Sequence, residues 1–90
     1  MKHYTPEHFL RWYYELADRI VNRLEKELYI KDAVALFSTW GSYITFRITE
    51  YNSIFYTDIT VTFNFLDKHD EEFTYQKILE ARNINYILKE

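Results

Sequence analysis

The chain has 90 residues, a formal net charge of −3 at pH 7, one glycine, one proline and no cysteine. Its length is that of a single compact domain, residues 1–90, and the missing cysteine excludes disulfides, thiol nucleophiles and thiolate zinc sites. One glycine excludes the glycine-rich loops that bind phosphate groups, and no apolar run is long enough to span a bilayer.

Residues 5–28 carry the signals of a helix. Thr5 suits the N-cap and Pro6 suits the first helical position, where a missing N–H costs nothing. Apolar side chains then recur at steps of three and four as far as Leu24, which predicts a helix running to about Leu28. The opposite arc alternates acids and bases, as a solvated face does. The alternative is a phosphate-binding stripe formed by the basic side chains Arg11, Arg19, Arg23 and Lys26.

Residues 33–39 have the composition of a first strand, followed by a turn at residues 40–42. A three-residue turn would place Ala35 and Phe37 on the outer face of the sheet, and a two-residue turn would place them on the inner face. In either register this edge strand shows apolar groups on both faces, which usually means that another element or a partner covers it. In an alternative assignment, Asp32 caps a second helical segment.

Residues 43–66 form the clearest element, a β-hairpin. Apolar and polar side chains alternate from Ile44 to Thr49 and again from Ile59 to Phe65, which is the period of half-buried strands. A turn centred on residues 52–53 sets Arg47 opposite Asp58, so that opposite charges face each other. This register also directs the apolar strand residues Ile44, Phe46, Ile59 and Val61 to one face.

The segment after the hairpin begins with an acidic cluster. Asp70 suits an N-cap, and the acids after it suit the first turn of a helix that ends near Arg82. The alternation of Phe73 and Tyr75 leaves a fourth strand as the alternative. Residues 84–88 are expected to form a short closing strand or a tail. The cluster does not have the spacing of a calcium-binding loop.

These elements predict an α+β fold, a three-stranded antiparallel meander packed by a long N-terminal helix, with a shorter C-terminal helix. The order α-β-β-β-α resembles the double-stranded-RNA-binding domain in outline. That family has a cluster of lysines at the start of its last helix, where this chain has Asp70, Glu71 and Glu72. The resemblance therefore does not imply that the chain binds RNA.

The sequence contains no recognisable catalytic motif. His3, His8 and His69 lack the spacing of metal ligands, and the serines fall in or beside turns. We therefore expect no enzyme activity, no cofactor and no metal site.

Surface recognition remains, because 18 of the 90 residues are aromatic. Large rings beside the turns either fold back over a small core or form an exposed patch of the residue types enriched at binding hot spots. The candidate partner-binding residues are the rings Phe37, Trp40, Tyr43, Tyr51, Phe55 and Tyr56 and the acids Asp67, Asp70, Glu71 and Glu72.

The leading hypothesis is a small cytoplasmic, non-enzymatic protein-binding module. Its composition is typical of phage and mobile-element proteins that inhibit host nucleic-acid-targeting defence complexes, which act in the host-cell cytoplasm. The first alternative is a nucleic-acid-binding module that uses the basic residues of the first helix, although the net charge disfavours it. The second is a homodimeric structural protein. No membrane partner is expected.

Overall fold

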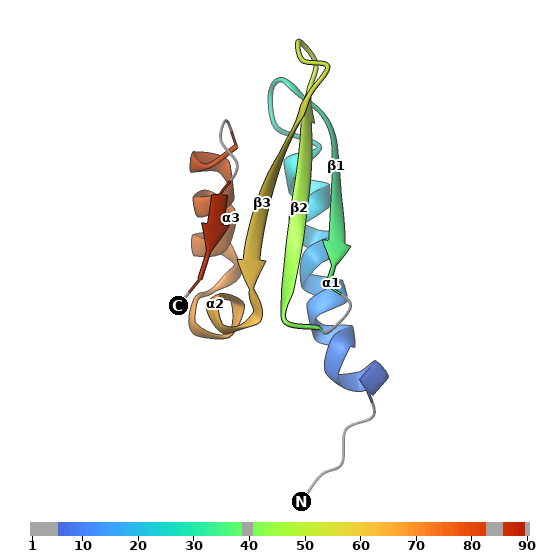
Figure 1. Ribbon diagram of the computed structural model, residues 1–90, viewed down its shortest axis with the longest axis vertical. Coiled ribbons are helices and arrows are strands. Elements are labelled where there is room, and N and C mark those ends of the chain that lie inside the picture. The colour runs from blue at the N-terminus through green and yellow to red at the C-terminus, as the bar shows by residue number, and fades with distance from the viewer. Residues whose placement is uncertain (1–5, 39–40, 83–85, 90) are drawn as a thin grey trace, which may run out of the picture.

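A four-stranded sheet with helices against one face forms the structure. The computed structural model describes residues 6–38, 41–82 and 86–89. The strands lie in the order β1-β2-β3-β4, antiparallel except for β4, which is parallel to β3. In Figure 1, α1 and α3 lie behind the sheet, and its other face is open. In chain order the elements are α1 (Pro6–Leu24), β1 (Ile30–Phe37), β2 (Tyr43–Glu50), β3 (Tyr56–Thr62), α2 (Phe63–Lys68), α3 (Glu71–Glu80) and β4 (Tyr86–Leu88).

This architecture confirms the α+β meander with an N-terminal helix, and it adds β4 as the short closing strand. Pro6 is the first residue of α1, as expected, whereas Thr5 lies outside the described residues. The core is a single cluster between helices and sheet. Its largest fully buried side chains include Ile20, Leu24, Ile44, Phe46, Ile48, Ile59 and Ile78.

The register of the β2–β3 hairpin is the predicted one. Arg47 lies opposite Asp58, and its Nε and Nη2 donate to the two carboxylate oxygens at 2.9 and 3.0 Å. The same guanidinium lies 3.9 Å above the centre of the Tyr56 ring. Thr45 and Thr60 share a hydrogen bond of 3.0 Å on this outer face. The hairpin is therefore fixed by polar pairs on its outer face and by apolar burial on its inner face.

The end of the hairpin differs from the prediction, because β3 stops at Thr62 and not at Phe65. The Thr62 hydroxyl accepts a hydrogen bond of 3.2 Å from the N–H of Phe65 and so caps α2. Phe63 and Phe65 are nevertheless buried, as predicted, because α2 turns both rings into the core. Their alternation is therefore compatible with a capped helix as well as with a strand.

The first helix is shorter than predicted, because α1 ends at Leu24 and not near Leu28. Tight-turn hydrogen bonds join Lys26 N–H to the Arg23 carbonyl and Glu27 N–H to the Leu24 carbonyl. The helix has no glycine or proline to mark this end. The chain leaves it because β1 has to begin at Ile30 to pair with β2.

In β1 the structure selects the register that turns its odd-numbered residues inward. Ala35 lies opposite Phe46, and Phe37 lies opposite Ile44. The outer-face placement of Ala35 and Phe37 is therefore wrong, and so is the helix capped by Asp32, since residues 30–37 form a strand. Val34 and Leu36 occupy the outer face instead and are 39% and 41% exposed.

The second predicted helix is confirmed as α3, and the fourth-strand alternative for this segment is wrong. Asp70 caps it by accepting a hydrogen bond of 2.7 Å from the N–H of Phe73. On the buried side of α3, the Tyr75 hydroxyl donates to the Glu27 carboxylate, beyond the end of α1. Burial raises the pKa of Tyr75, and Glu27 raises it further. This bond holds the segment between α1 and β1 against α3.

Candidate functional site

Two loops meet at one end of the molecule, which we call the tip. They are residues 25–29, between α1 and β1, and residues 51–55, between β2 and β3, both at the top of Figure 1. A backbone hydrogen bond of 2.9 Å from Tyr51 N–H to the Tyr29 carbonyl joins them. The meander thus brings into contact two segments that are far apart in the sequence.

The tip carries a cluster of exposed apolar side chains, which we call the tip patch. Among the described large apolar residues, the four most exposed all belong to it. Such side chains are normally scattered singly over a surface, so their concentration at one end makes the tip patch the candidate site. Their exposed fractions are 71% for Leu28, 55% for Tyr29, 67% for Tyr51, 91% for Ile54 and 74% for Phe55.

The backbone beneath the tip patch is held in a defined shape. Tyr29 has a φ of 73°, a left-handed conformation that is unfavourable for a bulky L-residue. In the second loop the Ser53 hydroxyl accepts from the N–H of Phe55 at 3.0 Å and lies 3.1 Å from its carbonyl. Strained backbone conformations of this kind cluster at functional sites. Ser53 thus acts in the turn, as its position in the sequence suggested.

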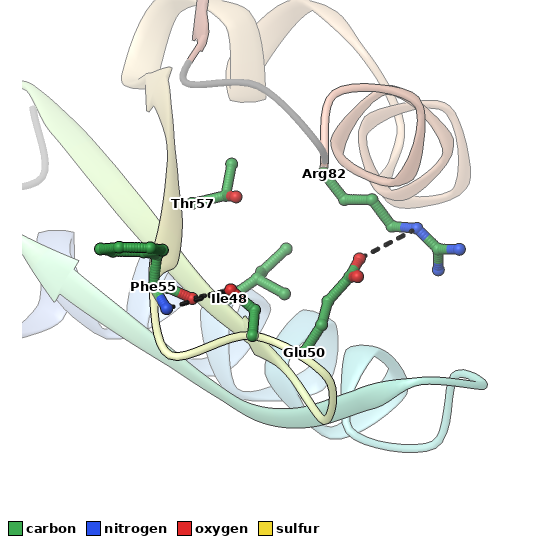
Figure 2. A pocket seen from close by; sticks show the side chains of 6 residues that line it. Ile48, Glu50, Phe55, Thr57 and Arg82 are labelled. Carbon is green, nitrogen blue, oxygen red and sulfur yellow. Dashed lines mark hydrogen bonds and ion pairs between the residues drawn. The ribbon is translucent and has the colours of Figure 1, made fainter.

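A small cleft lies beside the tip patch, with a volume of about 180 Å³. Figure 2 shows Glu50, at the end of β2, and Arg82, beyond α3, pointing toward each other across it. Arg82 Nε and Glu50 Oε1 are 3.7 Å apart, which is an ion pair but too long for a good hydrogen bond. The lining residues are Ile48, Glu50, Ser53, Phe55, Thr57 and Arg82.

Three of the predicted partner-binding rings come together at the tip. Tyr51 and Phe55 belong to the tip patch, and Tyr56 adjoins it, 53% exposed beneath Arg47. Tyr43 is 41% exposed but lies at the opposite end of β2. Trp40 lies outside the described residues.

Phe37 is not part of this surface. Its ring packs against Tyr14 of α1, with the ring centres 4.2 Å apart, and against the core. Of the two registers left open for β1, the one that places Phe37 on the outer face is therefore wrong, and the one that turns Phe37 inward is confirmed.

The predicted acidic residues contact other parts of the same chain. Asp67 accepts a hydrogen bond of 2.6 Å from the Tyr13 hydroxyl, and Asp70 caps α3. Glu71 and Glu72 form ion pairs with two arginines of α1, at 2.8 and 2.7 Å. These four acids thus join α2 and α3 to α1, or cap α3, and none of them lies in the tip patch.

The basic residues proposed to contact nucleic acid are the partners of these and other acids. Arg19 pairs with Glu71, Arg23 pairs with Glu72, and Arg11 pairs with Glu15 at 3.3 Å. Arg23 and Gln76 donate hydrogen bonds to Glu72 and lower the pKa of that carboxyl. The fourth residue, Lys26, is exposed. Three of the four positive charges are thus compensated within the chain.

Three members of the tip patch are not among the residues predicted to bind a partner. Leu28 falls in the predicted first helix, and Tyr29 and Ile54 are not among the candidate partner-binding residues. The run Ile54-Phe55-Tyr56 was a usable signal, because three consecutive large apolar residues in a hairpin turn cannot all be buried. The left-handed conformation of Tyr29 could not be predicted from the sequence, because glycine or asparagine is the residue normally found in that conformation.

Comparison of the chain with protein-family models, curated proteins and solved structures finds no match. Within the described part of the chain, no helix is long and apolar enough to cross a membrane. No group of three or more histidine, aspartate or glutamate side chains in that part is placed to hold a metal ion.

Proposed function

We propose that the protein is a non-enzymatic protein-binding module and that the tip patch is its recognition surface. The observation that carries this proposal is the exposure of Leu28, Tyr51, Ile54 and Phe55 on two loops that a backbone hydrogen bond joins. Large apolar and aromatic side chains release much surface from water when a partner covers them. Loops on a rigid sheet are a common position for binding residues.

The cleft beside the tip patch favours a protein over a small molecule. Its volume of about 180 Å³ is below the roughly 300–1,000 Å³ of typical ligand pockets. That space suits one or two side chains of a partner. Arg82 is 29% exposed and its guanidinium is only loosely held by Glu50, which leaves it donors for a carbonyl or carboxylate of that partner.

The charges around the tip patch favour a protein over single-stranded nucleic acid. Surfaces that stack bases regardless of sequence combine aromatic rings with a positively charged groove. The exposed charged residues that flank Leu28 and Tyr29 in the chain comprise two acids and two bases, so they carry no net charge. They are Glu25, Lys26, Lys31 and Asp32.

Affinity capture followed by mass spectrometry tests the proposal. The tagged chain is the bait. The first lysate to use is a bacterial one that contains nucleic-acid-targeting defence complexes, because this composition is associated with phage and mobile-element inhibitors of such complexes. Capture is performed with and without nuclease, using the wild-type chain and the double variant Ile54→Ala, Phe55→Ala. Ile87→Ala is the matched control, because Ile87 is also exposed, at 58%, but lies on β4.

We expect the wild-type chain to capture one protein in stoichiometric amount, with and without nuclease. The Ile87→Ala control should capture the same protein in the same amount. Each tip truncation should weaken binding at least about fivefold, the effect of about 1 kcal/mol at a hot spot. Equal capture by the double variant would refute the tip patch as the binding surface. Capture that disappears with nuclease would instead favour a nucleic-acid-binding function.

A further inference from the structure

The free edge of β1 is a second surface, to which another β-strand could hydrogen-bond. β1 stands at one end of the strand order, so no strand of the described chain covers its outer edge. Natural edge strands are usually protected by charges, proline or bulges. Here Lys31, Asp32 and a bulge protect only the start of the strand. Residues 33–37, Ala-Val-Ala-Leu-Phe, carry none of these devices.

The direction of the β1 backbone groups follows from one hydrogen bond. Ser38 N–H donates to the Tyr43 carbonyl at 3.1 Å, in line with the β1–β2 register. In an antiparallel ladder, hydrogen-bonded residues alternate with residues whose N–H and C=O point the other way. The backbone groups of Ala33, Ala35 and Phe37 therefore point to the free edge.

Apolar side chains flank this edge on both sides of the sheet. Val34 and Leu36 are half-exposed on the outer face. On the inner side, Tyr14 is 47% exposed where its ring meets Phe37. An added strand would therefore gain backbone hydrogen bonds and cover apolar surface on both faces.

We propose that the strand added to this edge is β1 of a second copy of the chain, antiparallel and centred on Ala35. This register pairs Ala35 with itself, Val34 with Leu36 and the small Ala33 with the large Phe37. Every residue whose backbone groups face the edge then meets another such residue. Two copies would form one continuous eight-stranded sheet with two-fold symmetry.

Self-complementarity is what identifies a second copy as the occupant. A register centred on Val34 would also pair edge-facing residues with one another, Ala33 with Ala35. It would, however, set Lys31 opposite Phe37 and Asp32 opposite Leu36. The Ala35-centred register avoids both conflicts, because Lys31 and Asp32 fall outside its five paired residues.

The number of residues that pair across the β1–β1 interface determines how tightly the two copies are expected to bind. Five paired residues a side are far fewer than the roughly 20–30 residues a side of a standard stable interface. The dimer therefore belongs to the weak, concentration-dependent class, and the two tip patches stay free at opposite ends of the joined sheet.

Sedimentation equilibrium from about 1 µM to about 1 mM tests the proposal. The wild-type chain should shift from the mass of one chain toward that of two. Ala35→Pro and Leu36→Lys should stay monomeric, because the first removes an edge-facing N–H and the second adds a charge to the β1–β1 interface. Ile87→Lys, on the opposite edge of the sheet, should dimerise like the wild type. Far-ultraviolet circular dichroism shows which variants are folded.

Disulfide trapping tests the register independently, because the natural chain has no cysteine. Under mild oxidation Ala35→Cys should form a covalent dimer at least about tenfold faster than Val34→Cys, since only residue 35 directly faces its own copy. A wild-type chain that stays monomeric over the whole range overturns the proposal, as does a dimer that persists in both folded edge variants. Faster trapping of Val34→Cys overturns the register.

Discussion

Replacing Tyr29 by glycine and by alanine gives an unusual order of stabilities. At ordinary positions glycine is less stable than alanine by about 0.5–1 kcal/mol, because it gives the unfolded chain more freedom. Tyr29 has a φ of 73°, where a side chain with a Cβ atom is disfavoured and glycine is not. We therefore expect Tyr29→Gly to be more stable than Tyr29→Ala.

The magnitude follows from two opposing contributions. Removing the Cβ atom relieves about 1–2 kcal/mol of backbone strain, and the added freedom of the unfolded chain takes back about 0.5–1 kcal/mol. With the middle of each range, the net advantage of glycine over alanine is about 0.75 kcal/mol. Both substitutions remove the same half-exposed ring, so its contacts cancel in the comparison. In a domain of this size the difference corresponds to about 3–6 °C in Tm.

Thermal unfolding followed by far-ultraviolet circular dichroism measures the difference. The matched control is Tyr51, the other end of the hydrogen bond between the loops, which has an ordinary negative φ. There Tyr51→Gly should be less stable than Tyr51→Ala. An alanine variant at position 29 more stable than the glycine variant by the ordinary difference of about 0.5–1 kcal/mol would show that the left-handed conformation of Tyr29 carries no strain, and the prediction would be refuted.

Two further predictions concern α3. Asp70→Ala should lower the free energy of unfolding in urea by about 1 kcal/mol by removing the helix cap, while Asp70→Asn should keep most of it; equal losses in both would contradict a capping role. Arg23 and Gln76 donate hydrogen bonds to the Glu72 carboxylate, so the pKa of Glu72 is lower in the folded chain than its value near 4.5 in the unfolded chain. The ionised carboxylate therefore contributes to stability above pH 4.5, and this contribution is lost as the pH falls through the folded-state pKa. Glu72→Gln should therefore flatten the acid limb of a plot of unfolding free energy against pH, and a limb parallel to the wild type would exclude this contribution.

The elements that the sequence predicted well are those in which several local signals agree. In the hairpin, the two-residue period and the pairing of Arg47 with Asp58 indicate the same register, which the structure confirms. At α3, the cap Asp70 and the acids after it agree in the same way. Such agreement between levels is what makes a segment predictable from its own residues.

The sequence-based predictions were wrong where tertiary contacts, and not local residues, determine the secondary structure or the strand register. Nothing local ends α1 at Leu24, and its end depends on where β1 pairs with β2. Phe63 and Phe65 fit a strand and a capped helix equally well, and α2 is selected because it buries both rings. The register of β1 depended on the length of a turn that the sequence left open. The tip patch was only partly predicted, because its first loop follows from the early end of α1.

The parallel strand β4 has a consequence for the order of folding. Each turn of the β1-β2-β3 meander joins neighbours in the chain, whereas β4 reaches its place beside β3 only after α2 and α3. Pairings between segments distant in the sequence are slow to form, because a longer loop has to close first. We expect the meander to form early and β4 to dock late. The 51–55 loop that carries part of the tip patch is also the loop that closes the β2–β3 hairpin, so substitutions made there to test binding also act on the formation of the hairpin.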